Sequence, residues 1–299
     1  TSFYLPPTNK INQLVNKFIV ARYYANKLRD GIAYVYTPTA ADLIHYKDER
    51  NFSVVFDIVH NWRELPWNNK GLLSCHHKLM KNADALFCDS RPLLEDLQKT
   101  YKREIELLTP GVTQDWLMQC QKFSTSLSSR KAPFNAVFYG NLRANSDIEL
   151  LEFVAENNVK LTIYGIMTDE VRARLKDKVI HYPPIAQNKL VAELERFDFV
   201  ILPYSNDRFS QWISPAKYYE VVALGKPIIS RSKLNHLESW DKLVYNLDLD
   251  SHGVETTLKA ALNDFQSQNK VQIACKLAHE NTWKKKIRIV HNRLEIIAK

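Results

Sequence analysis

The chain has 299 residues, of which 45% are hydrophobic and 25% are charged, which is typical of a globular protein and excludes a disordered one. Its net charge of +8 and its pI of about 9.1 fit nucleic acid, an anionic membrane surface or a phosphorylated ligand as partner. No apolar run reaches the ~20 residues that a membrane span needs, and no signal peptide is visible.

The cysteines are too far apart for a metal site or a redox pair. They are Cys75, Cys88, Cys120 and Cys275, with no Cys-x-x-Cys spacing among them. We therefore expect reduced thiols in a cytoplasmic protein. The chain opens with Thr1 rather than Met, which suggests that its natural start is missing.

The first half opens with a predicted helix over 10–29, in which Ile11 to Ile19 recur at helical spacing. This stretch has five basic residues and no acidic one. We expect its apolar side to pack on a sheet, and the alternative is that it rests on anionic lipid. Strands are expected at 32–38, 53–59, 83–90 and 105–111, and a helix is expected at 70–82. A second helix is expected from Ser90 through Leu97, with Ser90 as its N-cap and Pro92 in its first turn.

Residues 121–133 are polar, rich in serine and aperiodic, which predicts a linker between two domains. The second half then alternates again. Strands are expected at 134–141, 159–165, 178–184, 198–204 and 226–230, and helices at 146–157, 168–176, 187–196, 217–224, 254–266 and from about 270 to 297. The region 270–299 has eight basic residues against two acidic ones.

Repeated alternation of strand and helix predicts an α/β fold with two doubly wound, Rossmann-like domains that face a cleft. We place the N-terminal domain at 1–125, the C-terminal domain at 133–275, and a basic helix at 276–299 that packs back on the first domain. Ligands bind outside the carboxyl ends of parallel strands, so Gly140 and Gly165, at the ends of two strands, mark ligand-facing edges.

The second half contains, in this order, FYGNLRANSDIELLEFVAENNVKLTIYG, VIHYPPIAQNKLVAELERFDFVILPYSND, SPAKYYEVVALGKPII and AHENTWKKKIRIV. These segments carry a resemblance to the donor domain of GT-B glycosyltransferases. Over 32–116 it is weaker but in order, in FDIVHNW, ADALFCDSRPLLEDL and LTPGV. The chain is most similar to bacterial enzymes of the glycogen-synthase-like superfamily, family 4/1 type, that build surface polysaccharides.

This resemblance implies that the domain 133–275 binds a nucleotide-sugar donor and that the domain 1–125 binds the acceptor. Glu220 would accept hydrogen bonds from the ribose hydroxyls, and Lys217, three residues earlier on the same helix face, would neutralise the diphosphate together with Arg143. Arg143 could equally be a surface loop residue, and Tyr204 could border the sugar or belong to the core. The remaining donor-binding candidates are Gly140, Asn141, Gly165 and Ser214.

One position departs from the family pattern. Relatives with a paired glutamate motif carry a second Glu eight positions before the residue that matches Glu220, and here that position is Trp212. The departure leaves open whether the anomeric configuration is retained or inverted, and it keeps a catalytically silent, donor-binding subunit as an alternative.

Two residues at the end of the strand 53–59 are candidates for catalysis. His60 could be the general base towards the acceptor hydroxyl or could hydrogen-bond the donor sugar, and Asp57 could be the base of an inverting mechanism. Both could instead be structural, with Asp57 capping the turn. The adjacent His76 and His77 point to different helix faces and make a poor metal pair.

The resemblance implies no cofactor and no metal, because GT-B enzymes generally work without one. The expected function is transfer of a hexosyl group from a nucleotide sugar to a glycan or lipid-linked acceptor in the cytoplasm, with peripheral contact at the inner face of the membrane. Alternatives are a silent nucleotide-sugar-binding subunit and a nucleotide-sugar 2-epimerase, and nucleic-acid binding rests on charge alone.

Overall fold

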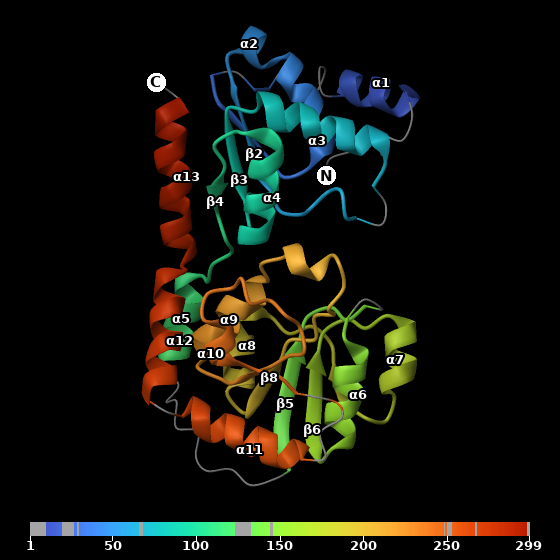
Figure 1. Cartoon of the computed structure of the whole chain (residues 1–299), viewed down its shortest axis with the longest axis vertical. Helices are drawn as coiled ribbons and strands as arrows, with labels where there is room; N and C mark the ends of the chain where they lie inside the picture. Colours follow the sequence, from blue (N-terminus) through green and yellow to red (C-terminus); the bar gives the residue numbers. More distant parts are fainter. Residues whose placement is uncertain are drawn as a thin grey trace. The chain divides into compact units, whose positions relative to one another are not determined.

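The computed structural model describes residues 10–19, 27–28, 30–65, 68–122, 133–143, 146–247, 249, 253–266 and 268–297. The chain forms two compact units (Figure 1). The first unit comprises Thr1–Thr109, Trp212–Ser214 and Lys286–Lys299, and the second comprises Pro110–Gln211 and Pro215–Lys285.

The first unit is built on a parallel sheet of four strands in the order β1-β2-β3-β4. The strands are β1 (Ile32–Val35), β2 (Ser53–Ile58), β3 (Ala85–Cys88) and β4 (Glu106–Leu107). The central strands β2 and β3 are almost wholly buried, as their continuous apolar sequences predict for strands covered on both faces.

Helices cover both faces of this sheet. The elements are α1 (Lys10–Ile19), η2 (Pro38–His45), α2 (Lys47–Arg50), α3 (Lys70–Asn82), α4 (Arg91–Tyr101) and α13 (Trp283–Ile297). One face, with Val54, Phe56 and Leu86, packs against η2, α3 and α4. The other, with Val55 and Phe87, packs against α13, so the predicted return of the C-terminal helix to the first domain is confirmed (Figure 1).

Three details of the first unit differ from the sequence prediction. Pro38 does not end a strand but begins the 3-10 helix η2. The helix that follows Ser90 runs on to Tyr101 rather than Leu97, and Ser90 is its N-cap by position only. Its hydroxyl makes no capping bond and instead donates a hydrogen bond to the Trp212 carbonyl oxygen.

The apolar side of α1 faces away from the protein. Ile11, Leu14 and Phe18 are 74%, 69% and 64% exposed, whereas Asn16 is only 2% exposed. The helix packs against η2. The expectation that its apolar residues pack on the sheet is therefore wrong.

The second unit has a parallel sheet of six strands in the order β10-β9-β8-β5-β6-β7. The strands are β5 (Phe134–Tyr139), β6 (Val159–Tyr164), β7 (Ile180–Tyr182), β8 (Phe199–Ile201), β9 (Ile228–Ile229) and β10 (Val244–Tyr245). Counted along this unit, the order is the 3-2-1-4-5-6 arrangement of dinucleotide-binding folds. The strand order reverses between β5 and β8, and ligands of such sheets bind outside the carboxyl ends at this point.

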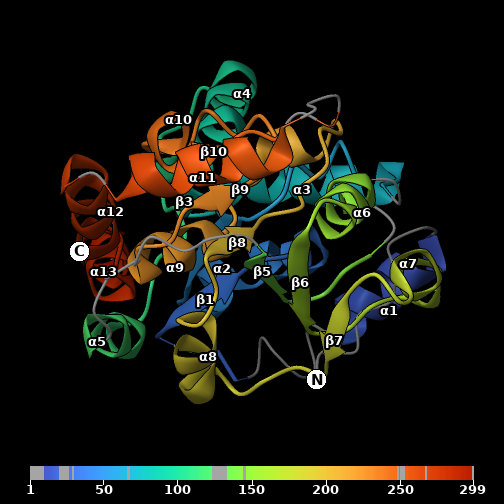
Figure 2. The same ribbon diagram turned by 90° about the horizontal axis from the view of Figure 1, so that it is seen from below.

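Helices cover both faces of the second sheet as well. The helices between β4 and α13 are α5 (Gln114–Lys122), α6 (Ile148–Glu156), α7 (Asp169–Leu175), α8 (Gln187–Leu194), η3 (Ser210–Trp212), α9 (Ala216–Leu224), α10 (Trp240–Leu243), α11 (Val254–Phe265) and α12 (Gln268–Glu280). Helices α6, α7 and α11 share one core with the sheet. Figure 2 shows α8 and α9 on the side of the sheet opposite α6 and α11.

The expected helix from about 270 to 297 is two helices, and this prediction is wrong. The break falls at Asn281 and Thr282, where the segment around Val112 lies alongside the chain. The Val112 N–H donates to the Asn281 carbonyl oxygen at 2.8 Å, and the Trp283 N–H donates to the Val112 carbonyl oxygen at 2.9 Å. These bonds take up backbone groups that a continuous helix would use for itself.

The second compact unit begins earlier than the domain boundary expected from the sequence. Its first helix, α5, packs against α8 and α9 and therefore joins this unit. The predicted linker at 121–133 begins with the last two residues of α5, and residues 123–132 lie outside the described part of the chain.

Candidate functional site

Two glycines lie directly after β5 and β6, at the carboxyl ends of these strands. Gly140 has φ +125° and Gly165 has φ +152°, a region that other residues rarely adopt. A Cβ on Gly165 would lie 1.8 Å from the Gly140 carbonyl oxygen, and one on Gly140 would lie 2.7 Å from Lys217 Nζ. The two loops can therefore approach each other only without a side chain at Gly165, and a side chain at Gly140 would displace the end of Lys217.

Lys217 is the cation of this site. It lies in the first turn of α9, half-buried, with Nζ 5.9 Å from the ring centroid of Phe138 and 5.7 Å from that of Tyr139. Burial lowers the pKa of Lys217, and the negative charge of Glu220 opposes that shift. A partly desolvated ammonium beside a glycine loop and a helix N-terminus is suited to a phosphate group.

Glu220 lies one turn further along α9 and is held by two aromatic residues. The Tyr139 hydroxyl donates to Glu220 Oε2 at 3.0 Å, and Trp116 Nε1 donates to the Glu220 carbonyl oxygen at 3.0 Å. Burial, followed by the charge of Glu220, raises the pKa of Tyr139 well above its usual value. Tyr139 therefore stays protonated as a donor and fixes the orientation of the carboxylate.

The other donor-site candidates lie around this group. Burial, followed by the charge of Glu220, raises the pKa of Tyr204. Asn141 and Arg143 are exposed on the loop after Gly140, where the Arg143 N–H donates to Ser146 Oγ at 3.2 Å. Ser214 is buried directly before Pro215, the N-cap of α9, in the short segment that clusters with the first unit.

The structure thus brings together most of the predicted donor site. Gly140, Gly165, Tyr204, Lys217 and Glu220 form one group at the carboxyl edge of the second sheet. Sequence reasoning missed Tyr139 and Trp116. Tyr139 could have been found as the last residue of a buried strand directly before Gly140, but Trp116 is distant in sequence and gave no signal.

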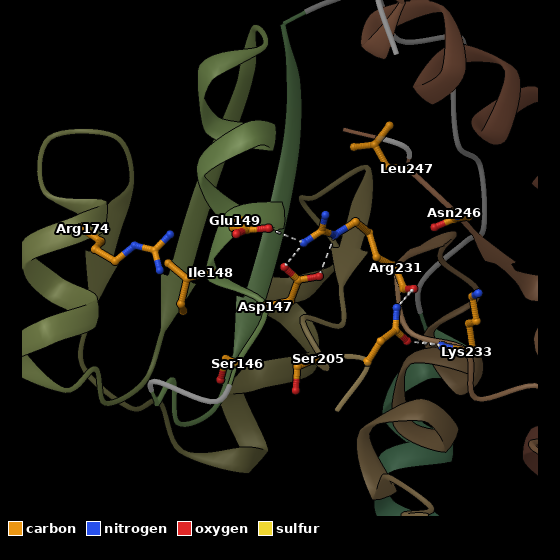
Figure 3. A pocket seen from close by; sticks show the side chains of 11 residues that line it. Ser146, Asp147, Ile148, Glu149, Arg174, Ser205, Arg231, Lys233, Asn246 and Leu247 are labelled. Carbon is orange, nitrogen blue, oxygen red and sulfur yellow. Dashed lines mark hydrogen bonds and ion pairs between the residues drawn. The ribbon is translucent and has the colours of Figure 1, made fainter. Parts of the chain in front are cut away.

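A cavity of about 540 Å³ lies at the same edge of the second sheet (Figure 3). Ion pairs between its own residues line part of its wall. Arg231 donates through Nε and one terminal nitrogen to the two carboxylate oxygens of Asp147, at 2.8 and 2.6 Å. Arg231 also donates to Glu149 at 3.1 Å. The predicted donor-binding residues do not line this cavity. Arg231 and Asp147 therefore satisfy each other in the wall of this cavity.

A buried carboxyl group lies at the carboxyl end of the first sheet. Asp57, in β2, is buried and accepts a hydrogen bond from the Tyr34 hydroxyl at 2.9 Å. Burial raises the pKa of Asp57 to about 6, although the bond from Tyr34 acts in the opposite direction. Its Oδ1 is buried without a hydrogen-bond partner. Asp57 can therefore accept a proton near neutral pH.

Asp89 is a second carboxyl that sequence reasoning missed, and its side chain is half-buried. It follows β3, and alternation from Ala85 and Phe87 places it on the face that Val55 and Asp57 share. Burial, reinforced by the charge of Asp57, raises the pKa of Asp89 to about 8. The rule that singled out Asp57, a carboxylate at the end of a buried strand, would also have found Asp89.

His60 differs from Asp57 in its place relative to β2 and in the direction of its pKa shift. It lies beyond the end of β2, half-buried, with its ring 5.7 Å from that of Trp62 in an edge-on arrangement. Burial lowers the pKa of His60, so the ring is neutral at physiological pH. The charge of Asp57, by contrast, helps to raise the pKa of Asp89.

The described residues contain neither a metal-binding cluster nor a membrane-spanning helix. His76 is buried and His77 exposed, as their adjacent positions predict. Within the described residues, no group of three or more His, Cys, Asp or Glu side chains is arranged to hold a metal ion. In the same part of the chain, no helix is both long enough and apolar enough to cross a bilayer.

Searches against protein families and curated protein sequences find no match to the chain. Solved structures do match. A glycosyltransferase from Rickettsia africae ESF-5 aligns with a TM-score of 0.64 and 12% identity over 100% of this chain and 85% of its own. Anabaena Alr3699/HepE in complex with UDP aligns with a TM-score of 0.66 and 12% identity over 97% and 84%.

A third solved structure extends the comparison. An alpha-glucosyltransferase in complex with UDP-glucose and DNA containing an abasic site aligns with a TM-score of 0.56 and 13% identity, over 94% of this chain and 84% of that one. At these identities the likeness establishes the fold alone. This chain has the two-domain, Rossmann-like α/β fold of GT-B glycosyltransferases, as its sequence predicted.

Proposed function

We propose that this protein is a glycosyltransferase that moves a hexosyl group from a nucleotide-sugar donor to a glycan or lipid-linked acceptor. The observation that carries the proposal is the arrangement of Lys217, Gly140 and Glu220 at the point of strand reversal in the second sheet. A cation beside a side-chain-free loop suits a diphosphate, and an oriented carboxylate suits the two hydroxyls of a ribose.

In the proposed reaction the acceptor hydroxyl attacks the anomeric carbon, and the bond from that carbon to the diphosphate oxygen breaks. The negative charge that grows on the diphosphate is stabilised by Lys217 and Arg143. The hydroxyl proton passes to a base in the first unit, for which Asp57 is the leading candidate because burial raises its pKa to about 6. His60 is the alternative base or a contact to the sugar.

We further propose that the reaction needs no metal and serves cell-surface polysaccharide assembly in a bacterial cytoplasm, at the inner face of the membrane. The sequence contains one Asp-x-Asp pair, Asp248 and Asp250, which lies outside the described residues. Turnover in the presence of EDTA tests whether the reaction needs a metal. Undiminished turnover is expected, and loss of activity that Mn²⁺ restores would assign a metal to the reaction.

Donor binding is tested by thermal shift with UDP, GDP, ADP, CMP and their common sugars. A ligand that binds the folded protein raises its melting temperature. We expect a selective rise that disappears in Glu220→Ala and Glu220→Gln; the glutamine variant retains an acceptor for the Tyr139 hydroxyl. Glu170→Ala, which removes an exposed carboxylate in α7, is the matched control and should keep the rise.

Turnover distinguishes the proposed reaction from its alternatives. Release of nucleotide from the bound sugar in the presence of a glycan or lipid-linked acceptor supports transfer. Conversion of the sugar without an acceptor indicates a 2-epimerase, and binding without any conversion indicates a silent subunit. A rise in melting temperature that survives in both Glu220 variants removes Glu220 from the site.

A further inference from the structure

The loops that follow β5 and β6 continue the parallel pairing of these two strands. Tyr139 and Tyr164, the last residues of the strands, lie opposite each other, and Leu142 and Met167 form a further parallel bridge at the same offset along the chain. Within this bridge the Leu142 N–H donates to the Ile166 carbonyl oxygen at 2.8 Å. The backbone of the first loop is therefore tied to that of the second beyond the ends of the strands.

One hydrogen bond of this ladder is not made. In a regular parallel pair with this register, the Ile166 N–H donates to the Gly140 carbonyl oxygen. Among the residues that the structure describes, none accepts a hydrogen bond from the Ile166 N–H. The Gly140 carbonyl oxygen lies instead against Gly165, where a Cβ would meet it at 1.8 Å, and both glycines have positive φ. The conformations of the two glycines therefore leave the Ile166 N–H as an unused donor.

His181, in β7, holds the peptide that carries this donor. Its Nε2 lies 2.8 Å from the Gly165 carbonyl oxygen, which can only accept, so Nε2 carries the proton. Its Nδ1 lies 3.4 Å from a terminal nitrogen of Arg172, which can only donate, so a single tautomer satisfies both contacts. A trans peptide directs its C=O and its N–H in opposite directions. The bond from His181 to the Gly165 carbonyl therefore aims the Ile166 N–H away from His181.

The opposite side is that of the loop after β5, which also carries the cation of the site. The Ile166 carbonyl oxygen is bonded to Leu142 in this loop, and a Cβ on Gly140 would lie 2.7 Å from Lys217 Nζ. A backbone N–H and an ammonium group thus lie beside the same glycine, and such a pair of donors suits a phosphate oxygen. We propose that the Ile166 N–H donates a hydrogen bond to the diphosphate of the nucleotide sugar and that His181 is its positioning residue.

This inference rests on the proposed function, because it assigns a further contact to the same diphosphate. The two can nevertheless fail separately. A nucleoside diphosphate that binds in a Glu220-dependent way without affecting the Ile166 amide supports the donor site and overturns the role of Ile166. A chain that binds neither a nucleoside diphosphate nor pyrophosphate overturns both proposals.

The test follows backbone amide signals by NMR in the full chain, which carries isotope-labelled isoleucine. Inorganic pyrophosphate, UDP, GDP and ADP are each titrated in, and the signal that Ile166→Val removes is that of Ile166. We expect this signal to move downfield as the amide becomes hydrogen-bonded to a phosphate oxygen. The amide signal of Ile296, an exposed residue of α13, is the control and should stay in place.

Variants of His181 test its part in positioning the donor. His181→Leu removes the bond to the Gly165 carbonyl oxygen, so the same diphosphate should bind about tenfold more weakly and move the Ile166 signal less at saturation. His181→Gln keeps an N–H in place of Nε2 and should restore both readouts, whereas His291→Leu, at an exposed position of α13, is the control and should bind like the wild type.

Melting temperatures show whether the variants are folded. Equal affinity of the wild type and His181→Leu overturns the positioning role, as does a loss of affinity that His181→Gln does not restore. If His181→Leu does not fold, the titration of the wild type decides, and an Ile166 signal that stays in place while the diphosphate binds overturns the proposal.

Discussion

At the scale of single residues, Lys217 should matter for the donor and little for folding. Removing its ammonium in Lys217→Met removes a charge-assisted hydrogen bond to the diphosphate, so we expect affinity for the nucleotide sugar to fall about 10- to 100-fold. Burial already disfavours the charged form, so the variant should be no less stable than the wild type. Isothermal titration calorimetry measures the affinity, and Lys189→Met, at an exposed position of α8, is the control.

Asp57 should give the reaction a pH dependence. As a base it must be ionised, and burial raises its pKa to about 6, so kcat/KM should fall about tenfold per pH unit below that value. Asp57→Asn should remove most of the turnover while leaving donor affinity intact. An acid limb that persists in Asp57→Asn with full turnover would assign the role to another group, and Asp177→Asn serves as the control at an exposed aspartate.

Some residues of the candidate site could be predicted from the sequence, and others could not. Gly140 and Gly165 were predictable because they follow buried strands, whereas Lys217 and Glu220 were predicted from the resemblance to GT-B donor domains, with their spacing placing them on one helix face. Trp116 was not predictable, because its contact with Glu220 spans 104 positions and depends on how α5 packs on α9. Local pattern carries no information on such a contact.

At the scale of elements, the junction between the β5 and β6 loops should tolerate no side chain. In Gly165→Ala the new Cβ would meet the Gly140 carbonyl oxygen at 1.8 Å on a backbone with φ +152°, so we expect the free energy of unfolding to fall by about 2–4 kcal/mol. Gly253→Ala is the matched control, since its Cβ would meet nothing closer than 3.8 Å and the change should stay within about 1 kcal/mol. Urea titration of both variants compares them, and equal effects would contradict the role of Gly165.

Element boundaries followed the sequence where local signals set them and departed from it where tertiary contacts did. Helix α3 begins and ends where its pattern predicts, at Lys70 and Asn82. The break between α12 and α13 was missed, because the periodicity continues through Asn281 and Thr282 and only the backbone pairing with Val112 interrupts it. For α1 the periodicity was correct, but a helical pattern does not state which side faces the protein.

At the scale of the whole molecule, His76 and Asp89 change the free energy of unfolding in opposite directions as the pH varies. His76 is buried and neutral, with a pKa lowered to about 4, so the folded protein binds fewer protons than the unfolded one and loses stability as the pH falls from 6.5 towards 4. Asp89 has a pKa raised from 3.8 to about 8, so the folded protein retains a proton that the unfolded one releases. Its contribution is complete below pH 3.8 and is lost as the pH rises through about 8.

Between pH 6.5 and 8 only the second of these two groups titrates, and this window isolates Asp89. Asp89→Asn keeps the volume of the side chain and removes its ionisation. The free energy of unfolding of the variant, relative to that of the wild type, should therefore rise by about 1–2 kcal/mol from the lower pH to the higher. That difference corresponds to a gain of several degrees in the melting temperature of the unit that contains it. Thermal unfolding of both proteins at the two pH values measures it, with Asp177→Asn as the exposed control. A difference that stays constant across the window would mean that Asp89 is ionised throughout, and the raised pKa of this carboxyl would then be wrong.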